Sequence, residues 1–293
     1  MAVSAPGERF VLIVPPQTVG GGLPTWDPSR AAAAMAAEFG GSPYDQRQVL
    51  LKNLPLATGW QSDTHVVAQR LAAAGLEAWS LPASALDTLP VAVEARSFRL
   101  TDAGLEAIAQ GGVSLTLPWP SVELVLRART EFQVNATTET TKKKTNLAAM
   151  AIGLPIGSKS TTVERNQTVG DTWFAVLCAR RPNLVLRLTR DGLDYSGLGS
   201  AKGPGALVNY VTLLELVERR CPGARIDPRL EKAAGRIPPV PAEARRSVTK
   251  SGKTTVAEAV SNADNAEAVA FAGQLLWLAE RLRRAGIAAG ASL

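Results

Sequence analysis

Residue types that carry acid–base or nucleophilic chemistry are scarce in this chain of 293 residues. It has one histidine, His65, and two cysteines, Cys178 and Cys221. A Ser-His-Asp or Cys-His relay would have to use His65, which lies near the start of a predicted helix. A zinc site would need ligands from distant segments, because the sequence has no CxxC or HxxxH pair. We therefore predict no catalytic residue, no metal site, no cofactor and no enzymatic activity.

Carboxylates are the remaining route to catalysis. Asp191, Asp194 and Asp227 are the candidates for this weaker alternative, but no motif surrounds any of them. Several carboxylates that converge in one deep pocket would favour this alternative.

The run Ser251–Thr254 matches the end of a phosphate-binding loop, but Ser247 stands where that loop needs its first glycine, and no apolar strand precedes it. We reject that motif.

Charge is spread unevenly along the chain. Residues 1–90 have 5 basic and 7 acidic side chains, residues 91–235 have 19 and 14, and residues 236–293 have 8 and 5. The positive excess favours an anionic partner, which could be nucleic acid, phospholipid or an acidic protein face. No RNA-binding motif or basic recognition helix is present, so nucleic acid is not the expected partner.

Location is predicted from what the sequence lacks. It has no signal-peptide pattern at Met1–Arg9, and no apolar run approaches the roughly 18–20 residues of a membrane-spanning helix. Two isolated thiols suit a reducing compartment. We predict a cytoplasmic protein and leave membrane association open.

Residues 1–90 are predicted to form a small three-stranded α/β sandwich with the order β-α-α-β-α-β. Asp27-Pro28 and Ser42-Pro43 are strong helix starts. The predicted elements are a strand over Arg9–Pro15, helices over Ser29–Phe39 and from Ser42, a strand within Leu54–Trp60, a helix from Ser62 and a strand over Leu76–Pro82.

The segment Val66–Ala78, with the sequence VVAQRLAAAGLEA, is similar to the last helix and strand of the domain shared by the bacterial ribosomal stalk protein and the ClpS-type protease adaptors. The resemblance implies helices on one face of a three-stranded antiparallel sheet, and family members dock protein partners. It carries over no ligand-binding residue.

Residues 91–235 change to a pattern of strands followed by one amphipathic helix over Ala206–Arg220. The phrases FRLTDAGL at Phe98–Leu105 and LPWPSVELV at Leu117–Val125 resemble the opening of the bacterial pleckstrin-homology-like domain. That resemblance implies a β-barrel capped by the helix, in a family that binds phosphoinositides or proteins. A long insertion departs from the family pattern and puts a loop-mediated ligand site in doubt.

The insertion, residues 135–170, has two threonine-rich basic arms around an apolar tip. The arms are β-branched and could pair as a β-ribbon. The tip is too short to span a bilayer but long enough to dip into one. It could also pack on its own chain or on another protein. The predicted contact residues are Leu147, Met150, Ile152, Leu154 and Ile156 at the tip, and the predicted anion or lipid contacts are Lys142, Lys143, Lys144, Lys159 and Arg165.

The last 58 residues are predicted to contain a Pro-rich basic linker, 236–254, and a tethered amphipathic helix, 255–293. Phe271, Leu275, Trp277 and Leu278 are the predicted partner contacts of this helix. The predicted fold class is therefore α+β: sandwich, barrel with inserted ribbon, and helix.

Function is predicted from these surfaces. We expect a non-enzymatic adaptor or scaffold that self-associates or docks a protein partner through the ribbon and the C-terminal helix. The alternative is a peripheral membrane protein that binds anionic lipid through residues 147–156 and their basic flanks.

Overall fold

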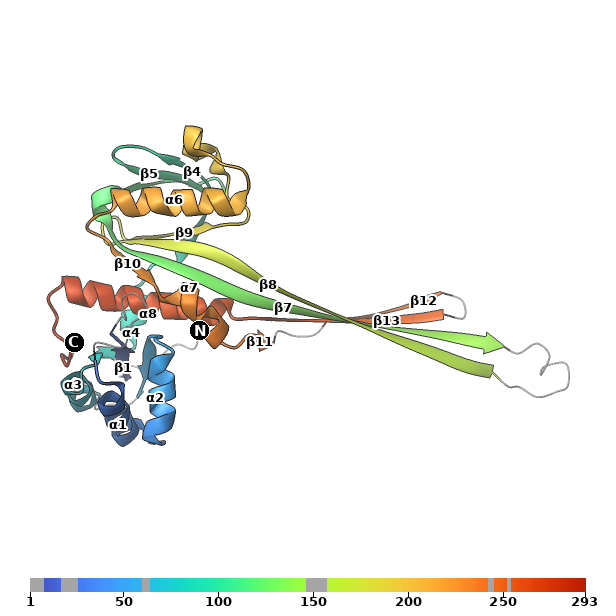
Figure 1. Cartoon of the computed structure of the whole chain (residues 1–293), viewed down its shortest axis with the longest axis horizontal. Coiled ribbons are helices and arrows are strands. Elements are labelled where there is room, and N and C mark those ends of the chain that lie inside the picture. Colours follow the sequence, from blue (N-terminus) through green and yellow to red (C-terminus); the bar gives the residue numbers. More distant parts are fainter. Residues whose placement is uncertain (1–7, 17–25, 60–63, 146–156, 242–244, 252–253) are drawn as a thin grey trace. The chain divides into compact units, whose positions relative to one another are not determined.

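The computed structural model describes residues 8–16, 26–59, 64–145, 157–241, 245–251 and 254–293 (Figure 1). The fold is mixed α+β, as predicted, with one three-stranded sheet and one large mixed sheet. The chain divides into two compact units: unit 1 is Met1–Arg129, Thr172–Ile237 and Glu267–Leu293, and unit 2 is Thr130–Asp171 and Pro238–Ala266.

The secondary-structure elements keep the labels of Figure 1. The strands are β1 (Arg9–Val14), β2 (Leu56–Thr58), β3 (Glu77–Pro82), β4 (Ala92–Leu100), β5 (Gly104–Ala109), β6 (Ser114–Pro118), β7 (Val122–Thr145), β8 (Gly157–Ala179), β9 (Leu184–Thr189), β10 (Arg225–Pro228), β11 (Val240–Pro241), β12 (Arg245–Ser251) and β13 (Thr254–Asp264). The helices are α1 (Pro28–Phe39), α2 (Pro43–Leu51), α3 (His65–Ala73), α4 (Ser84–Asp87), α6 (Ala206–Arg220), α7 (Arg229–Ala233) and α8 (Ala266–Arg284), with 3-10 turns η2 (Trp119–Ser121), η3 (Tyr195–Ala201) and η4 (Ala234–Arg236).

The first elements of unit 1 follow the predicted order β-α-α-β-α-β. Asp27 caps α1, since its carboxylate accepts hydrogen bonds from the backbone amides of Ser29 and Arg30. Ser42 caps α2 through the amide of Asp45. The three strands form an antiparallel sheet in the order β2-β1-β3. The local capping signals were therefore sufficient to predict where these helices begin.

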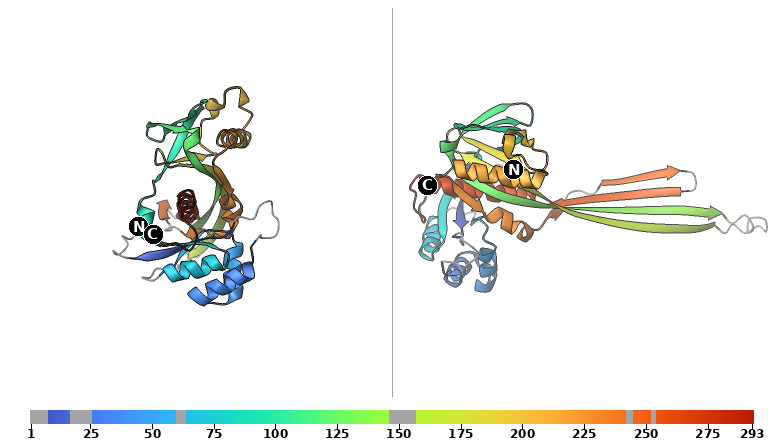
Figure 2. Two further views of the ribbon diagram at one scale, coloured as in Figure 1. Left: turned by 90° about the vertical axis from the view of Figure 1, so that its left-hand side faces the viewer. Right: turned by 45° about the horizontal axis from the view of Figure 1, so that its top comes forward.

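Strand β1 is buried on both faces. Val11 and Ile13 pack against α1, α2 and α3, whereas Phe10, Leu12 and Val14 belong to a second core that includes α8. Successive side chains of a strand point to opposite faces, so this short apolar run contributes to two cores at once. The small sheet therefore lies between its own helices and the C-terminal helix (Figure 2).

Helix α8 corrects two predictions for the C-terminal segment. It begins at Ala266, because residues 254–264 form strand β13 instead of the first turns of a helix. It is also buried on more than one side: Leu275, Trp277 and Leu278 are at most 5% exposed. The partners of these side chains come from β1 and β3 on one side and from β7, β8 and β9 on the other. α8 is therefore a central core helix of unit 1, and its stripe is not a free docking surface.

The other core of unit 1 joins the large sheet to α6. Within unit 1 the strand order is β7-β8-β9-β4-β5-β6, and β4 pairs in parallel with β9. Tyr210, Leu213 and Val217 of α6 pack against this sheet at helical spacing. The sheet is not a closed barrel. The resemblances to the pleckstrin-homology-like and stalk-protein domains stay predictions.

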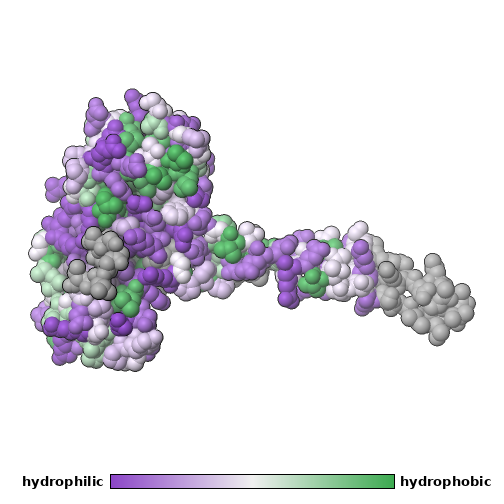
Figure 3. All heavy atoms as spheres, viewed as in Figure 1, coloured by the Kyte–Doolittle hydropathy of each residue, from purple (hydrophilic) through white to green (hydrophobic). Residues whose placement is uncertain are grey.

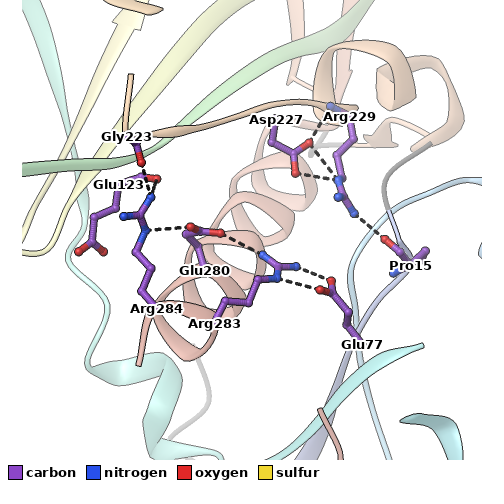
Figure 4. A network of polar contacts seen from close by, with 9 residues as sticks. All are labelled: Pro15, Glu77, Glu123, Gly223, Asp227, Arg229, Glu280, Arg283 and Arg284. Carbon is purple, nitrogen blue, oxygen red and sulfur yellow. Dashed lines mark hydrogen bonds and ion pairs between the residues drawn. The ribbon is translucent and has the colours of Figure 1, made fainter. Parts of the chain in front are cut away.

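A polar network connects α8 to its neighbours in unit 1 (Figure 4). Glu280, only 5% exposed, accepts hydrogen bonds from Arg283 (3.2 Å) and Arg284 (2.9 Å) on its own helix. Arg283 also forms a bidentate pair with Glu77 of β3, and Arg284 donates to the backbone carbonyls of Glu123 and Gly223. The cluster of arginines at the C-terminal end of α8 thus satisfies a buried carboxylate and two carbonyls, in addition to favouring the helix dipole.

Candidate interaction surface

In unit 2 the strands β13, β7 and β8 are neighbours in that order, and β11 and β12 both pair with β13. β13 pairs with β7 without a break from Thr254 opposite Lys142 to Asp264 opposite Phe132, and β12 pairs with the outer edge of β13. Thr141 and Thr161 fix the register of β8, since their hydroxyl oxygens are 3.2 Å apart. Gly170 agrees with that register, because a Cβ there would collide with the ring of Phe132. The threonine-rich arms are strands, as their composition predicted.

The register divides the cations of unit 2 between two faces. Directly opposed residues of an antiparallel pair point to the same face, and successive residues alternate. The face of Thr141 and Thr161 is here called the basic face. Among the side chains that the structure describes, it carries four exposed cations and one exposed carboxylate, Glu139. These cations are Lys159 and Arg165 of β8 and Arg246 and Lys250 of β12.

The opposite face has a different balance of charge. Among the described side chains it carries Lys142, Glu164, Glu258 and Asp264. The structure therefore separates Lys142 from Lys159 and Arg165, which the sequence analysis had grouped. Lys143 and Lys144 continue β7, but their side chains lie outside the description.

No described strand pairs with the outer edge of β8 in unit 2, and this edge is here called open. Every residue from Lys159 to Val169 is exposed, and β9 pairs with β8 only from Phe174 to Ala179. Figure 3 shows that the described surface of this sheet is mostly hydrophilic or intermediate, with scattered hydrophobic residues. Val163 and Val169 of β8 are 50% and 67% exposed. An open edge offers backbone donors and acceptors to an added strand.

The structure gives three outcomes for the predicted contact residues. Leu147, Met150, Ile152, Leu154 and Ile156 all lie outside the described residues, so the prediction for the tip stays a prediction. Leu275, Trp277 and Leu278 were predicted as partner contacts and are instead core residues of unit 1. Phe271 is 37% exposed, and of the four predicted helix contacts it is the one left at the surface.

The structure places the histidine and the two cysteines in different surroundings. His65 is exposed in the first turn of α3, and a ring nitrogen lies 3.1 Å from the side-chain amide of Gln69. Burial raises the pKa of the Cys221 thiol to about 11, and it raises the pKa of the Cys178 thiol further above its usual value. A thiol with a raised pKa is protonated at neutral pH and is a weak nucleophile.

We expect both thiols to resist alkylation in the folded protein. Iodoacetamide at pH 7.5 should modify Cys178 and Cys221 at least about tenfold more slowly than in 8 M urea, because burial removes both access and thiolate. Mass spectrometry of intact protein over time measures both rates. Rapid modification of either thiol under native conditions would contradict the burial described above.

Each candidate carboxylate has its own local partner. Asp191 pairs with Arg190, and Asp227 pairs with Arg229. Asp194 caps η3, and hydrogen bonds from the amide and hydroxyl of Ser196 lower the pKa of its carboxyl. Among the residues that the structure describes, no group of three or more His, Cys, Asp or Glu side chains is placed to hold a metal ion. Nor does any helix in the described ranges have the length and apolar character to cross a membrane.

Sequence reasoning missed two strands of this surface, β12 and β13. The signal was present: Val248 and Thr249 lead into the Ser251–Thr254 run, and Thr255 and Val256 follow it. β-branched residues on both sides of a Gly-containing connection are typical of a hairpin. The alanine and glutamate content of Val256–Ala263 favoured a helix instead, and the pairing with β7 outweighs that local preference.

Comparison with known proteins adds no assignment. No family model, curated protein or solved structure matches the chain.

Proposed function

We propose that the chain is a non-enzymatic interaction protein, and that it binds an acidic, extended segment of another protein along the outer edge of β8. The open edge from Lys159 to Val169 carries this proposal. Adding a strand to such an edge gives affinity through backbone hydrogen bonds and specificity through every second side chain.

Charge supports an acidic partner. Lys159 and Arg165 lie on the basic face of β8, and neither is in an ion pair with another described residue. A strand paired with β8 would place alternate side chains over this face, where glutamate or aspartate would meet both cations. Electrostatic complementarity of this kind raises association rates and excludes basic partners.

The same charges disfavour pairing with a second copy through β8. A two-fold pairing centred on Thr162 would put Lys159 opposite Arg165 of the other copy. A pairing centred on Glu164 would put Glu164 of one copy opposite Glu164 of the other, and a pairing centred on Arg165 would do the same with Arg165. Like charges directly opposed across two strands are destabilising. Charged residues on an edge strand are a general device against self-pairing.

A labelled eleven-residue peptide of alternating glutamate and valine tests the proposal by fluorescence anisotropy. We expect it to bind the full chain, to bind more weakly as NaCl rises from 50 to 500 mM, and to exceed a lysine–valine peptide in affinity. Replacing both cations, Lys159→Gln with Arg165→Gln, should weaken binding by about tenfold, since each exposed pair contributes up to about 1 kcal/mol.

The matched control makes the same net change of charge on the opposite face of the same strand. Ser160→Glu with Asn166→Glu should weaken binding clearly less than the two glutamine substitutions. Equal loss in both variants would contradict the assignment to the basic face. Flotation with vesicles of anionic lipid, in the absence of peptide binding, would favour the membrane alternative and overturn the proposal.

A further inference from the structure

Unit 1 contains a partly open cavity of about 190 Å³ between α8 and the large sheet. The lining includes four residues of the core that contains α8: Phe174 and Cys178 of β8, Val185 of β9 and Trp277 of α8. At the rim lie Val91, which is 82% exposed, and Ala270. The cavity thus connects the apolar interior of unit 1 with its surface.

The size and lining suit a small apolar group. A cavity of roughly 150 Å³ lined by aliphatic and aromatic side chains stays dry and holds benzene. The larger cavity here has room for one aromatic ring or a short acyl chain. Apolar ligands bind in concave sites of this character, where a few polar groups fix the orientation.

Two such polar groups line this cavity. The ring of Trp277 is 2% exposed, and its indole N–H has no acceptor among the described residues. Arg187 has its guanidinium carbon 3.8 Å from the centroid of the Phe174 ring, and its Nε lies 3.2 Å from the carboxylate of Glu94. The side chain of Arg187 is 27% exposed. A buried donor without an acceptor, such as the indole N–H of Trp277, is rare, because leaving it unpaired is costly.

We propose that this cavity binds a small monocarboxylate whose apolar part is a single ring or a short acyl chain. The apolar part fills the space beside Phe174, and the carboxylate accepts hydrogen bonds from Arg187 and Trp277. A carboxylate is favoured over a neutral acceptor because guanidinium–carboxylate hydrogen bonds are charge-assisted. An ammonium at the same place would face the guanidinium.

Calorimetry with three compounds of the same ring tests this class of ligand: benzoate, benzyl alcohol and benzylamine. Benzoate should bind the full chain at least tenfold more tightly than benzylamine, with benzyl alcohol between them. Hexanoate should behave as benzoate does. No heat from benzoate or hexanoate at 10 mM, or equal binding of benzoate and benzylamine, would overturn the proposal.

Variants assign the binding to this cavity. Ala270→Phe, which places a ring at the rim, should abolish benzoate binding, and Ala268→Phe is its control at an exposed position of α8 outside the lining. Arg187→Gln should remove the preference for benzoate over benzyl alcohol, and Trp277→Phe should weaken benzoate several-fold while keeping most of the ring. Circular dichroism confirms that each variant is folded. Benzoate binding that survives both Ala270→Phe and Arg187→Gln would place the ligand elsewhere and contradict the proposal.

Discussion

Replacing Asp227 with alanine is expected to lower the free energy of unfolding by about 3–5 kcal/mol. Asp227 and Arg229 are 2% and 3% exposed, and the guanidinium Nε lies 2.9 Å from one carboxylate oxygen. Arg229 also donates to the backbone carbonyl of Pro15, at the end of β1 (Figure 4). Without Asp227 the buried guanidinium of Arg229 would keep the carbonyl of Pro15 as a partner but lose its counter-charge. We expect a large effect because the positive charge would then be buried without a negative partner.

The double variant Asp227→Val with Arg229→Met separates the two contributions to this cost. It removes both charges together. It should therefore lower the free energy of unfolding clearly less than Asp227→Ala alone, because replacing a buried ion pair by apolar residues is often near neutral. Urea unfolding followed by circular dichroism measures all variants. The pair Arg190–Asp191 is the control, because the Asp191 side chain is 55% exposed: Asp191→Ala should cost at most about 1 kcal/mol. A loss below about 1 kcal/mol for Asp227→Ala would contradict the importance of the pair.

The sequence predicted the first six elements of unit 1 because the signals there are local. Asp27 and Ser42 sit where a side chain can cap a helix, and each is followed by proline. What the sequence did not reveal is that β1 serves two cores. A short apolar run is compatible with burial on one face or both, and the second partner, α8, is more than 250 residues away.

The character of α8 shows a related limit. Its large apolar residues predicted a stripe, but Ala272, Ala279 and Glu280 are buried as well. Alanine is common on both exposed and buried faces of helices, and glutamate is seldom buried without a partner. Burial of Glu280 depends on Arg283 and Arg284, so it is a property of the network rather than of one position.

The candidate surface could be predicted only in part. The threonine-rich arms and their cations were identified from composition. Which cations share a face depends on register, and one residue of shift moves every side chain to the other face. Lys142 and Lys159 are separated for that reason. β13 pairs with β7 across more than 100 residues of sequence, and no local pattern encodes such a contact.

The second large effect is expected at Gly104, where β5 approaches β6 closely. A Cβ at this position would lie 2.5 Å from the carbonyl oxygen of Leu117 and 2.9 Å from the Cα of Pro118. Both are backbone atoms, so no side-chain rotation relieves the contact. The backbone angles of Gly104 are open to other residues, and the obstacle is this approach alone. Gly104→Ala should therefore cost about 3 kcal/mol, at the upper end of the range for overpacking.

Gly223→Ala is the matched control, because a Cβ there meets no atom within 4 Å and the backbone is not left-handed. The same chemical change should alter the free energy of unfolding by less than about 0.5 kcal/mol. Thermal and urea unfolding of both variants measure the difference. Equal effects would mean that β5 can move away from β6 at little cost. A large effect confined to Gly104 would mean that β5 cannot move away from β6 at this point. The turn between β4 and β5 holds the start of β5 in place, since the Thr101 hydroxyl accepts from the Gly104 amide and the Thr101 amide donates to the Gly104 carbonyl.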